Sequence, residues 1–130
     1  MSGEIKLTKA QQAAGVDRVR DDLALVSGAG CGKTFVLARR FTELLLGSQS
    51  ETPLADFVAL TFTDKASLEM SQRVAKMLSD FAAKAPAAQR RRLRDWIQQL
   101  PEARISTIHS FCASILRAWA VEAGVDPDFA

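Results

Sequence analysis

Residues 23–34 read Leu-Ala-Leu-Val-Ser-Gly-Ala-Gly-Cys-Gly-Lys-Thr, and this stretch decides the fold. Its first four residues form a short continuous apolar run, which is typical of a strand buried on both faces. Three glycines within five residues follow as a turn. From Phe35 to Leu45, apolar residues then recur at helical spacing until Gly47. A buried strand, a glycine-rich turn and a helix, in this order, predict the first unit of an α/β domain.

The same order of strand and helix recurs twice downstream. Residues 57–60 and 105–108 are two more short strand candidates, and an apolar helical stripe follows each of them. A first helix is expected earlier in the chain, with Thr8 as its N-cap and Gly15 as its stop. The alternation predicts a parallel sheet with flanking helices. Three strands make a thin sheet, since most sheets have about five or six, so we expect an incomplete sheet that is the front part of a larger domain. The two stripes consist of Ala66, Met70, Val74, Met77, Leu78 and Phe81, and of Phe111, Ile115, Leu116 and Trp119.

A segment of different composition lies between the second and third strand candidates. Residues 84–104 hold six basic and two acidic residues, with an amphipathic face formed by Leu93, Trp96, Ile97 and Leu100. The simpler interpretation is a solvated connecting helix. The alternative is a basic helix that faces DNA.

Composition excludes several classes of protein. The 130 residues carry 17 Lys+Arg and 15 Asp+Glu, a formal net charge of +2, with 48% hydrophobic and 25% charged residues. These values are those of an ordinary globular domain rather than of a disordered or collagen-like chain. The charge is too small to indicate nucleic-acid binding by itself. There is no apolar window of about eighteen residues, hence no predicted membrane span, and the N-terminus lacks the order of a signal peptide. With only two cysteines as well, we expect a cytoplasmic protein.

The glycine-rich turn has the chemistry of a phosphate-binding loop, or P-loop. Its glycines let the backbone curl so that successive N–H groups point at a phosphate, and the following helix adds the partial positive charge of its N-terminus. Lys33 would act as a catalytic residue on the β- and γ-phosphates, and Thr34 would ligate Mg²⁺ through its hydroxyl. Ser27 stands where the strict pattern has glycine. A turn that only caps a helix is the alternative. The expected nucleotide-binding residues here are Ser27, Gly28, Ala29, Gly30, Cys31, Gly32, Lys33 and Thr34.

Three further segments accompany the P-loop in a fixed order. They are LTKAQ at residues 7–11, TFTDKA at residues 61–66 with Glu69, Met70 and Arg73 behind it, and TIHSFC at residues 107–112. They resemble the glutamine motif and the two motifs that follow the P-loop in superfamily 1 helicases of the UvrD/Rep type. The last segment resembles the branch that holds AddA and RecB, the helicase–nuclease subunits of double-strand-break repair. The resemblance extends over about residues 5–129 and implies a P-loop NTPase (RecA-like) fold.

The resemblance implies that ATP is bound outside the loop as well. The carboxamide of Gln11 can pair with the N6 and N7 edge of adenine, and the family's matching glutamine implies ATP over GTP; an exposed helix glutamine is the alternative. Arg73 would either face the nucleotide or be a surface helix charge. Phe35 stands where UvrD-like members often carry Arg, which leaves the adenine-side contact open.

Single-stranded DNA is the partner that the two later segments imply. Phe62 would stack on an unpaired base, which contributes ~1–3 kcal/mol per base; a core phenylalanine is the alternative. Asp64 replaces the Asn that is common in the family. His109 is the only histidine, so a metal site built on it is not expected. Phosphate contacts are expected from Thr61, Thr63 and Lys65, and the resemblance adds Thr107, His109 and Ser110 near the DNA backbone.

Hydrolysis of ATP needs an acidic pair after a strand, the Asp-Glu of the Walker B motif, to hold Mg²⁺ and position water. No Asp-Glu pair occurs in the sequence. We therefore expect residues 1–130 to be the N-terminal part of the ATP-binding domain of a UvrD-like helicase, truncated before Walker B. The parent would be an ATP-dependent DNA helicase, and its potential protein partner would be a second helicase–nuclease subunit. The chain alone is not expected to unwind DNA, and it is expected to hydrolyse ATP poorly or not at all.

Two other functions fit parts of the sequence. A small P-loop kinase explains the P-loop and the length, but not residues 7–11, 61–66 and 107–112. A non-catalytic nucleotide-binding module is the other alternative. ATPase assays with and without single-stranded DNA separate the three, because only the helicase interpretation predicts stimulation by DNA.

Overall fold

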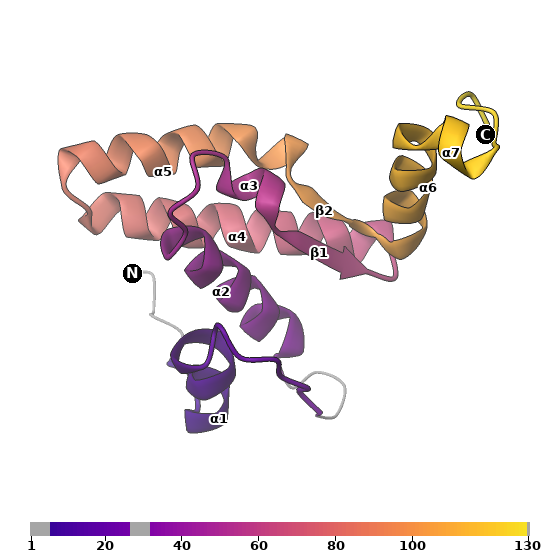
Figure 1. The fold of residues 1–130 in the computed structure, drawn as a ribbon. Helices are drawn as coiled ribbons and strands as arrows, with labels where there is room; N and C mark the ends of the chain where they lie inside the picture. The colour runs from indigo at the N-terminus through magenta and orange to yellow at the C-terminus, as the bar shows by residue number, and fades with distance from the viewer. Residues whose placement is uncertain (1–5, 27–31, 130) are drawn as a thin grey trace.

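Helices make up most of the structure, a computed structural model that describes residues 6–26 and 32–129 (Figure 1). The strands among these residues are β1, Val58–Thr61, and β2, Arg104–Thr107, so the predicted α/β chain has two strands here instead of three. The helices, in chain order, are α1 (Lys9–Gln12), the π-helix η1 (Ala13–Asp17), α2 (Lys33–Leu46), α3 (Pro53–Asp56), α4 (Asp64–Lys84), α5 (Ala87–Gln99), the 3₁₀ helix η2 (Leu100–Glu102), α6 (Ile108–Ala118) and α7 (Ala120–Ala123).

The core lies where α2 and α5 cover α4. α4 and α5 run antiparallel side by side, and α2 crosses α4 (Figure 1). The apolar face predicted for α4 is confirmed, because Met70, Val74 and Leu78 are fully buried. Burying such a side chain stabilises the fold by about 1.5–3 kcal/mol, so this core holds the strand ends firmly. The same cluster contains Ala38, Phe41 and Leu45 of α2, Leu93 and Trp96 of α5, and Leu100.

The two strands are adjacent and parallel, as predicted. Their register pairs Val58 with Arg104 and Thr61 with Thr107. Each strand is offset by one residue from its predicted bounds, 57–60 and 105–108, and Ile108 already begins α6. α4 and α5 form the long crossover connection that parallel strands require.

The strand predicted at residues 23–26 is wrong, because this segment has neither helix nor strand. Leu23, Leu25 and Val26 are exposed, Val26 to 92%. Within the ranges that the structure describes, β1 and β2 pair only with each other, so residues 23–26 have no ladder to join. An apolar run becomes a buried strand only where a neighbouring strand satisfies its N–H and C=O groups.

The first helix begins as predicted but does not end as predicted. The hydroxyl of Thr8 accepts from the N–H of Gln11 at 3.2 Å, and the Gln11 side chain accepts from the N–H of Thr8 at 2.9 Å, which makes a capping box. Gly15, the predicted stop, lies buried inside η1 instead. A Cβ at Gly15 would be 3.4 Å from Cγ of Arg39 on α2. This glycine therefore permits close packing of η1 on α2 rather than helix termination.

The basic segment forms α5, and its contacts favour the interpretation as a connecting helix. Trp96 is buried in the core. Arg90 donates to the carbonyl oxygens of Ala82 (3.2 Å) and Ala85 (3.0 Å) at the end of α4. The guanidinium of Arg92 lies over the Trp96 ring, 4.7 Å from its centroid. These two arginines satisfy helix-end carbonyls and cover the core.

The last helical stripe forms α6, and Gly124 ends α7 in the left-handed conformation (φ 67°), which agrees with its predicted role as a stop. Along α6, which is described in full, no residue is buried. None of the helices within residues 6–26 and 32–129 combines the length and the apolar composition of a membrane span.

Candidate nucleotide- and DNA-binding edge

The N-terminus of α2 has the geometry of a phosphate site. Gly32 is its N-cap, in a left-handed backbone conformation (φ 79°, ψ 23°) that favours glycine. Its carbonyl oxygen accepts the first helical hydrogen bond, from the N–H of Val36 at 3.0 Å. Among the described residues no side chain caps this end, and the first turn holds no acidic residue. Such a helix N-terminus attracts phosphate through its N–H groups and its dipole.

The residues predicted for the phosphate loop divide into two groups. Lys33, which is exposed, and Thr34, which is half-buried, occupy the first two positions of α2. Both side chains therefore belong to the turn that would face a phosphate. The predicted residues Ser27, Gly28, Ala29, Gly30 and Cys31 lie outside the described residues, and their roles stay predictions.

Gln11 lies beside this end of α2. Its Nε2 is 3.1 Å from the position that a Cβ on Gly32 would take. Its Oε1 accepts from the N–H of Thr8, and a carboxamide oxygen has a second lone pair that can accept from a ligand. The structure thus brings the glutamine segment to the phosphate loop, as a joint site for a base and its phosphates requires.

The two segments predicted to bind DNA begin at adjacent strand ends. Thr61 and Thr107 are register partners at the carboxyl ends of β1 and β2. β1 leads through Phe62 and Thr63 into α4, and β2 leads directly into α6, so both segments leave one edge of the sheet (Figure 1). In open α/β sheets, ligands bind at this edge.

The hydroxyl groups of Thr61 and Thr107 are used inside the chain. Thr61 Oγ1 donates to the carbonyl oxygen of Thr63 at 3.1 Å and contacts Ser67 Oγ. Thr107 is buried, donates to Ser110 Oγ at 3.0 Å and accepts from the N–H of Ser110 at 3.1 Å. A hydroxyl has a single proton to donate, so a bond from either group to a DNA phosphate would replace an internal bond. Their phosphate contacts stay predictions, and the structure gives both groups a part in shaping the edge.

The groups that this edge exposes are an aromatic ring and its polar neighbours. Phe62 is 87% exposed, so the alternative of a core phenylalanine is wrong. Thr63, Lys65, His109 and Ser110 are exposed too. An exposed ring with a cation nearby is the combination that binds single-stranded nucleic acid by stacking and by charge.

Arg73 forms an ion pair within α4. Its Nη2 lies 2.8 Å from Oε1 of Glu69, one turn earlier. This contact fits the alternative of a surface helix charge, and a contact with the nucleotide stays a prediction. The described part of the chain, residues 6–26 and 32–129, holds no group of three or more His, Cys, Asp and Glu residues that could bind a metal ion.

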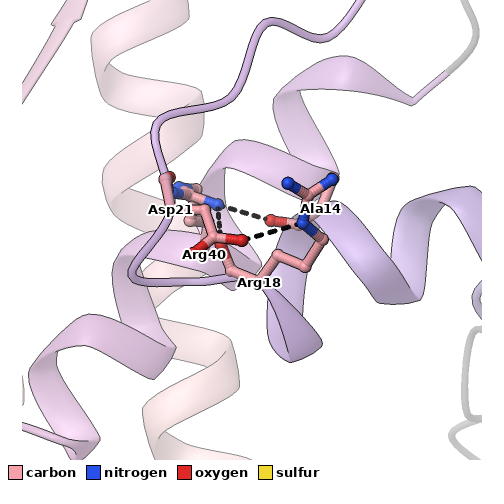
Figure 2. A network of polar contacts seen from close by, with 4 residues as sticks. All are labelled: Ala14, Arg18, Asp21 and Arg40. Carbon is pink, nitrogen blue, oxygen red and sulfur yellow. Dashed lines mark hydrogen bonds and ion pairs between the residues drawn. The ribbon is translucent and has the colours of Figure 1, made fainter.

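Sequence reasoning missed Arg40, which fastens the glutamine segment to α2. Its guanidinium donates to the carbonyl oxygens of Ala14 (2.9 Å), Arg18 (3.0 Å) and Asp21 (Figure 2). The available signal was a pair of arginines, Arg39 and Arg40, inside an apolar helical pattern. Half-buried arginines in such a position need partners from another segment.

Comparison with known proteins confirms the family that the motifs suggested. Residues 7–130 match the UvrD/REP helicase N-terminal domain. The chain is 38% identical over 126 residues to AddA, the ATP-dependent helicase/nuclease protein of Latilactobacillus sakei subsp. sakei (strain 23K), and the match covers 95% of this chain and 14% of that protein. The protein of the same name from Lactobacillus johnsonii is 38% identical over 124 residues (95% and 10%), and that from Moorella thermoacetica is 35% identical over 118 residues (91% and 8%).

The chain therefore spans 8–14% of the length of these relatives. The matching family is a helicase family, which sets the small-kinase alternative aside. It also implies a RecA-like fold, of which the two parallel strands and their flanking helices are a part. The chain belongs to the UvrD/REP helicase N-terminal domain family.

Proposed function

We propose that this chain is the ATP-binding portion of an ATP-dependent DNA helicase of the AddA type, a single-stranded DNA translocase of double-strand-break repair. The observation that supports this most strongly is the approach of Gln11 to Gly32, with Nε2 3.1 Å from the Cβ position of the glycine. A group that reads a base thereby lies beside backbone that binds phosphate. The chain by itself would bind ATP and DNA without unwinding DNA.

The chain's own residues would hold ATP at the start of α2. The backbone N–H groups of the first turn would bind the phosphates, and the carboxamide of Gln11 would pair with the adenine edge. Lys33 would place its ammonium on the β- and γ-phosphates, and Thr34 would offer its hydroxyl to Mg²⁺. When bound, Mg²⁺ neutralises charge on the phosphate oxygens. The absence of a side chain at Gly32 leaves room for this arrangement.

Single-stranded DNA would lie along the edge where β1 and β2 end. Phe62 would stack on an unpaired base, and Lys65 and His109 would contact the phosphate backbone, together with Thr63 and Ser110. Thr61 and Thr107 would orient these loops through their internal hydrogen bonds. The proposed protein partner is a second helicase–nuclease subunit, because the relatives are themselves named as subunits of a helicase/nuclease.

Calorimetric titration of Mg·ATP into the protein tests the nucleotide site. Lys33→Ala should weaken binding roughly tenfold to 100-fold, because it removes a charge-assisted bond to phosphate of about 1.5–3 kcal/mol. Lys76→Ala is the matched control, since Lys76 is an exposed lysine of α4, and its affinity should equal that of the unmodified chain.

Equal affinities of the Lys33→Ala and unmodified proteins would refute the proposal, and so would a lack of ATP binding. If ATP binds and single-stranded DNA does not, the proposed DNA edge fails. The non-catalytic nucleotide-binding module then becomes the better description.

A further inference from the structure

Arg40 lies on α2 about two turns after the phosphate-binding end. Its three described hydrogen bonds all go to backbone carbonyl oxygens, those of Ala14, Arg18 and Asp21 (Figure 2). Ala14 lies in η1, Arg18 is the C-cap of η1, and Asp21 follows in the next turn. Carbonyls at a helix end lack partners within the helix, and the planar fork of a guanidinium can satisfy several of them at once.

The helix that Arg40 holds is the one that carries Gln11. α1 and η1 follow each other without a break from Lys9 to Asp17, so Gln11 and Ala14 lie on one continuous helical piece. At one end of this piece Arg40 binds the carbonyls, and at the other Nε2 of Gln11 approaches Gly32. Both contacts are made with α2 or its N-cap. α2 therefore sets the spacing between the carboxamide and the phosphate-binding N–H groups.

Arg39, the adjacent arginine, has different partners. Its guanidinium pairs with Glu43 at 2.7 Å and lies over the ring of Phe81, 5.0 Å from the centroid. Only its methylene groups lie against η1, at Gly15. The two arginines share a helix and differ in what their charged groups hold, which makes Arg39 a matched control.

We propose that Arg40 is a positioning residue that sets the preference of this site for adenine, by holding the carboxamide of Gln11 against the phosphate loop. The inference rests on the proposed function. Arg40 contacts neither base nor phosphate in it. Loosening its three bonds lets the α1–η1 piece move on α2, so the carboxamide no longer meets the N6 and N7 edge while the phosphates stay bound at the helix N-terminus.

The test compares dissociation constants of Mg·ATP, Mg·GTP and inorganic tripolyphosphate for the whole chain and four variants: Arg40→Met, Gln11→Ala, their double mutant and Arg39→Met. A bidentate contact to the adenine edge discriminates between bases by at least roughly tenfold in well-built sites. Arg40→Met should reduce the ratio of the GTP and ATP constants by that factor, as Gln11→Ala does. The double mutant should show no further loss, because both residues act through one contact. Tripolyphosphate affinity should be unchanged in all four, and Arg39→Met should keep the base preference.

Equal weakening of ATP, GTP and tripolyphosphate by Arg40→Met would overturn the inference, because it would show a general structural role. An unchanged ratio would overturn it too, with ATP binding itself left intact. Failure of the unmodified chain to bind any of the three ligands would instead refute the proposed function and this inference with it. If Arg40→Met does not fold, Arg40→Lys decides in its place: it keeps the charge without the fork, and it should lower the ratio by a smaller factor.

Discussion

Three helices begin at the proposed binding edge, and their N-termini are of two kinds. α2 begins at Gly32, and no described side chain caps it. α4 and α6 begin at Thr63 and Thr107, whose hydroxyls accept from the N–H groups of Ala66 and Ser110 at 3.1 Å each. A threonine cap satisfies a backbone N–H that a phosphate would otherwise bind, whereas glycine leaves it open. The difference indicates that backbone would bind the nucleotide at α2, and that side chains would bind DNA at α4 and α6.

Removal of the exposed ring is the change with the largest expected effect. Phe62→Ala should weaken binding of single-stranded DNA by ~1–3 kcal/mol, the contribution of one stacked base. ATP affinity and melting temperature should not change, since the ring is 87% exposed. Fluorescence anisotropy with a labelled oligonucleotide and a thermal melt measure these quantities.

The control for Phe62 is Trp119→Ala. Trp119 is 61% exposed and lies at the C-cap of α6, the opposite end of that helix from the sheet edge. Its loss should leave DNA affinity unchanged. Equal losses in the two variants would show that any exposed aromatic ring of this chain binds DNA, and the contrast between the strand edge and the rest of the surface would fail.

A side chain at the cap of α2 should have the smaller effect. Gly32→Ala places a Cβ 3.1 Å from Gln11 Nε2 and forces alanine into a left-handed conformation that costs roughly 1–2 kcal/mol. We expect ATP affinity, measured by calorimetry, to fall by about tenfold or less, while DNA affinity stays the same.

Gly124→Ala isolates the strain from the site. Gly124 also has a positive φ, 67°, but a Cβ there would meet nothing within 4 Å. Both variants should lose similar stability in a thermal melt, and only Gly32→Ala should lose ATP affinity. A Gly32→Ala protein that binds ATP normally would place the nucleotide away from this cap.

Features that depend on local pattern could be predicted from the sequence. The periodic apolar residues of α4 and the capping box at Thr8 are examples, because neighbours within a few residues determine both. The meeting of the two DNA segments could also be predicted, since parallel strands end at one edge of a sheet. The order of the motifs was enough to name the family.

Features that depend on a distant partner could not be predicted. Residues 23–26 are as apolar as a buried strand, but whether they join a ladder depends on strands elsewhere. Gly15 resembles a helix stop, and only the position of Arg39 shows that it is a packing contact. In the site, sequence suggested that Thr61 binds phosphate, and only the folded chain shows its hydroxyl bound to the Thr63 carbonyl.

One measurement tests the difference between the helix ends most directly: a ¹H–¹⁵N correlation spectrum of the protein, recorded with and without Mg·ATP. We predict shifts of the backbone amides of Gly32, Lys33 and Thr34 and of the side-chain amide of Gln11, with no shift at the threonine-capped amides of Ala66 and Ser110. Shifts at Ala66 and Ser110, with Gly32, Lys33, Thr34 and Gln11 unmoved, would contradict the assignment of ATP to the N-terminus of α2.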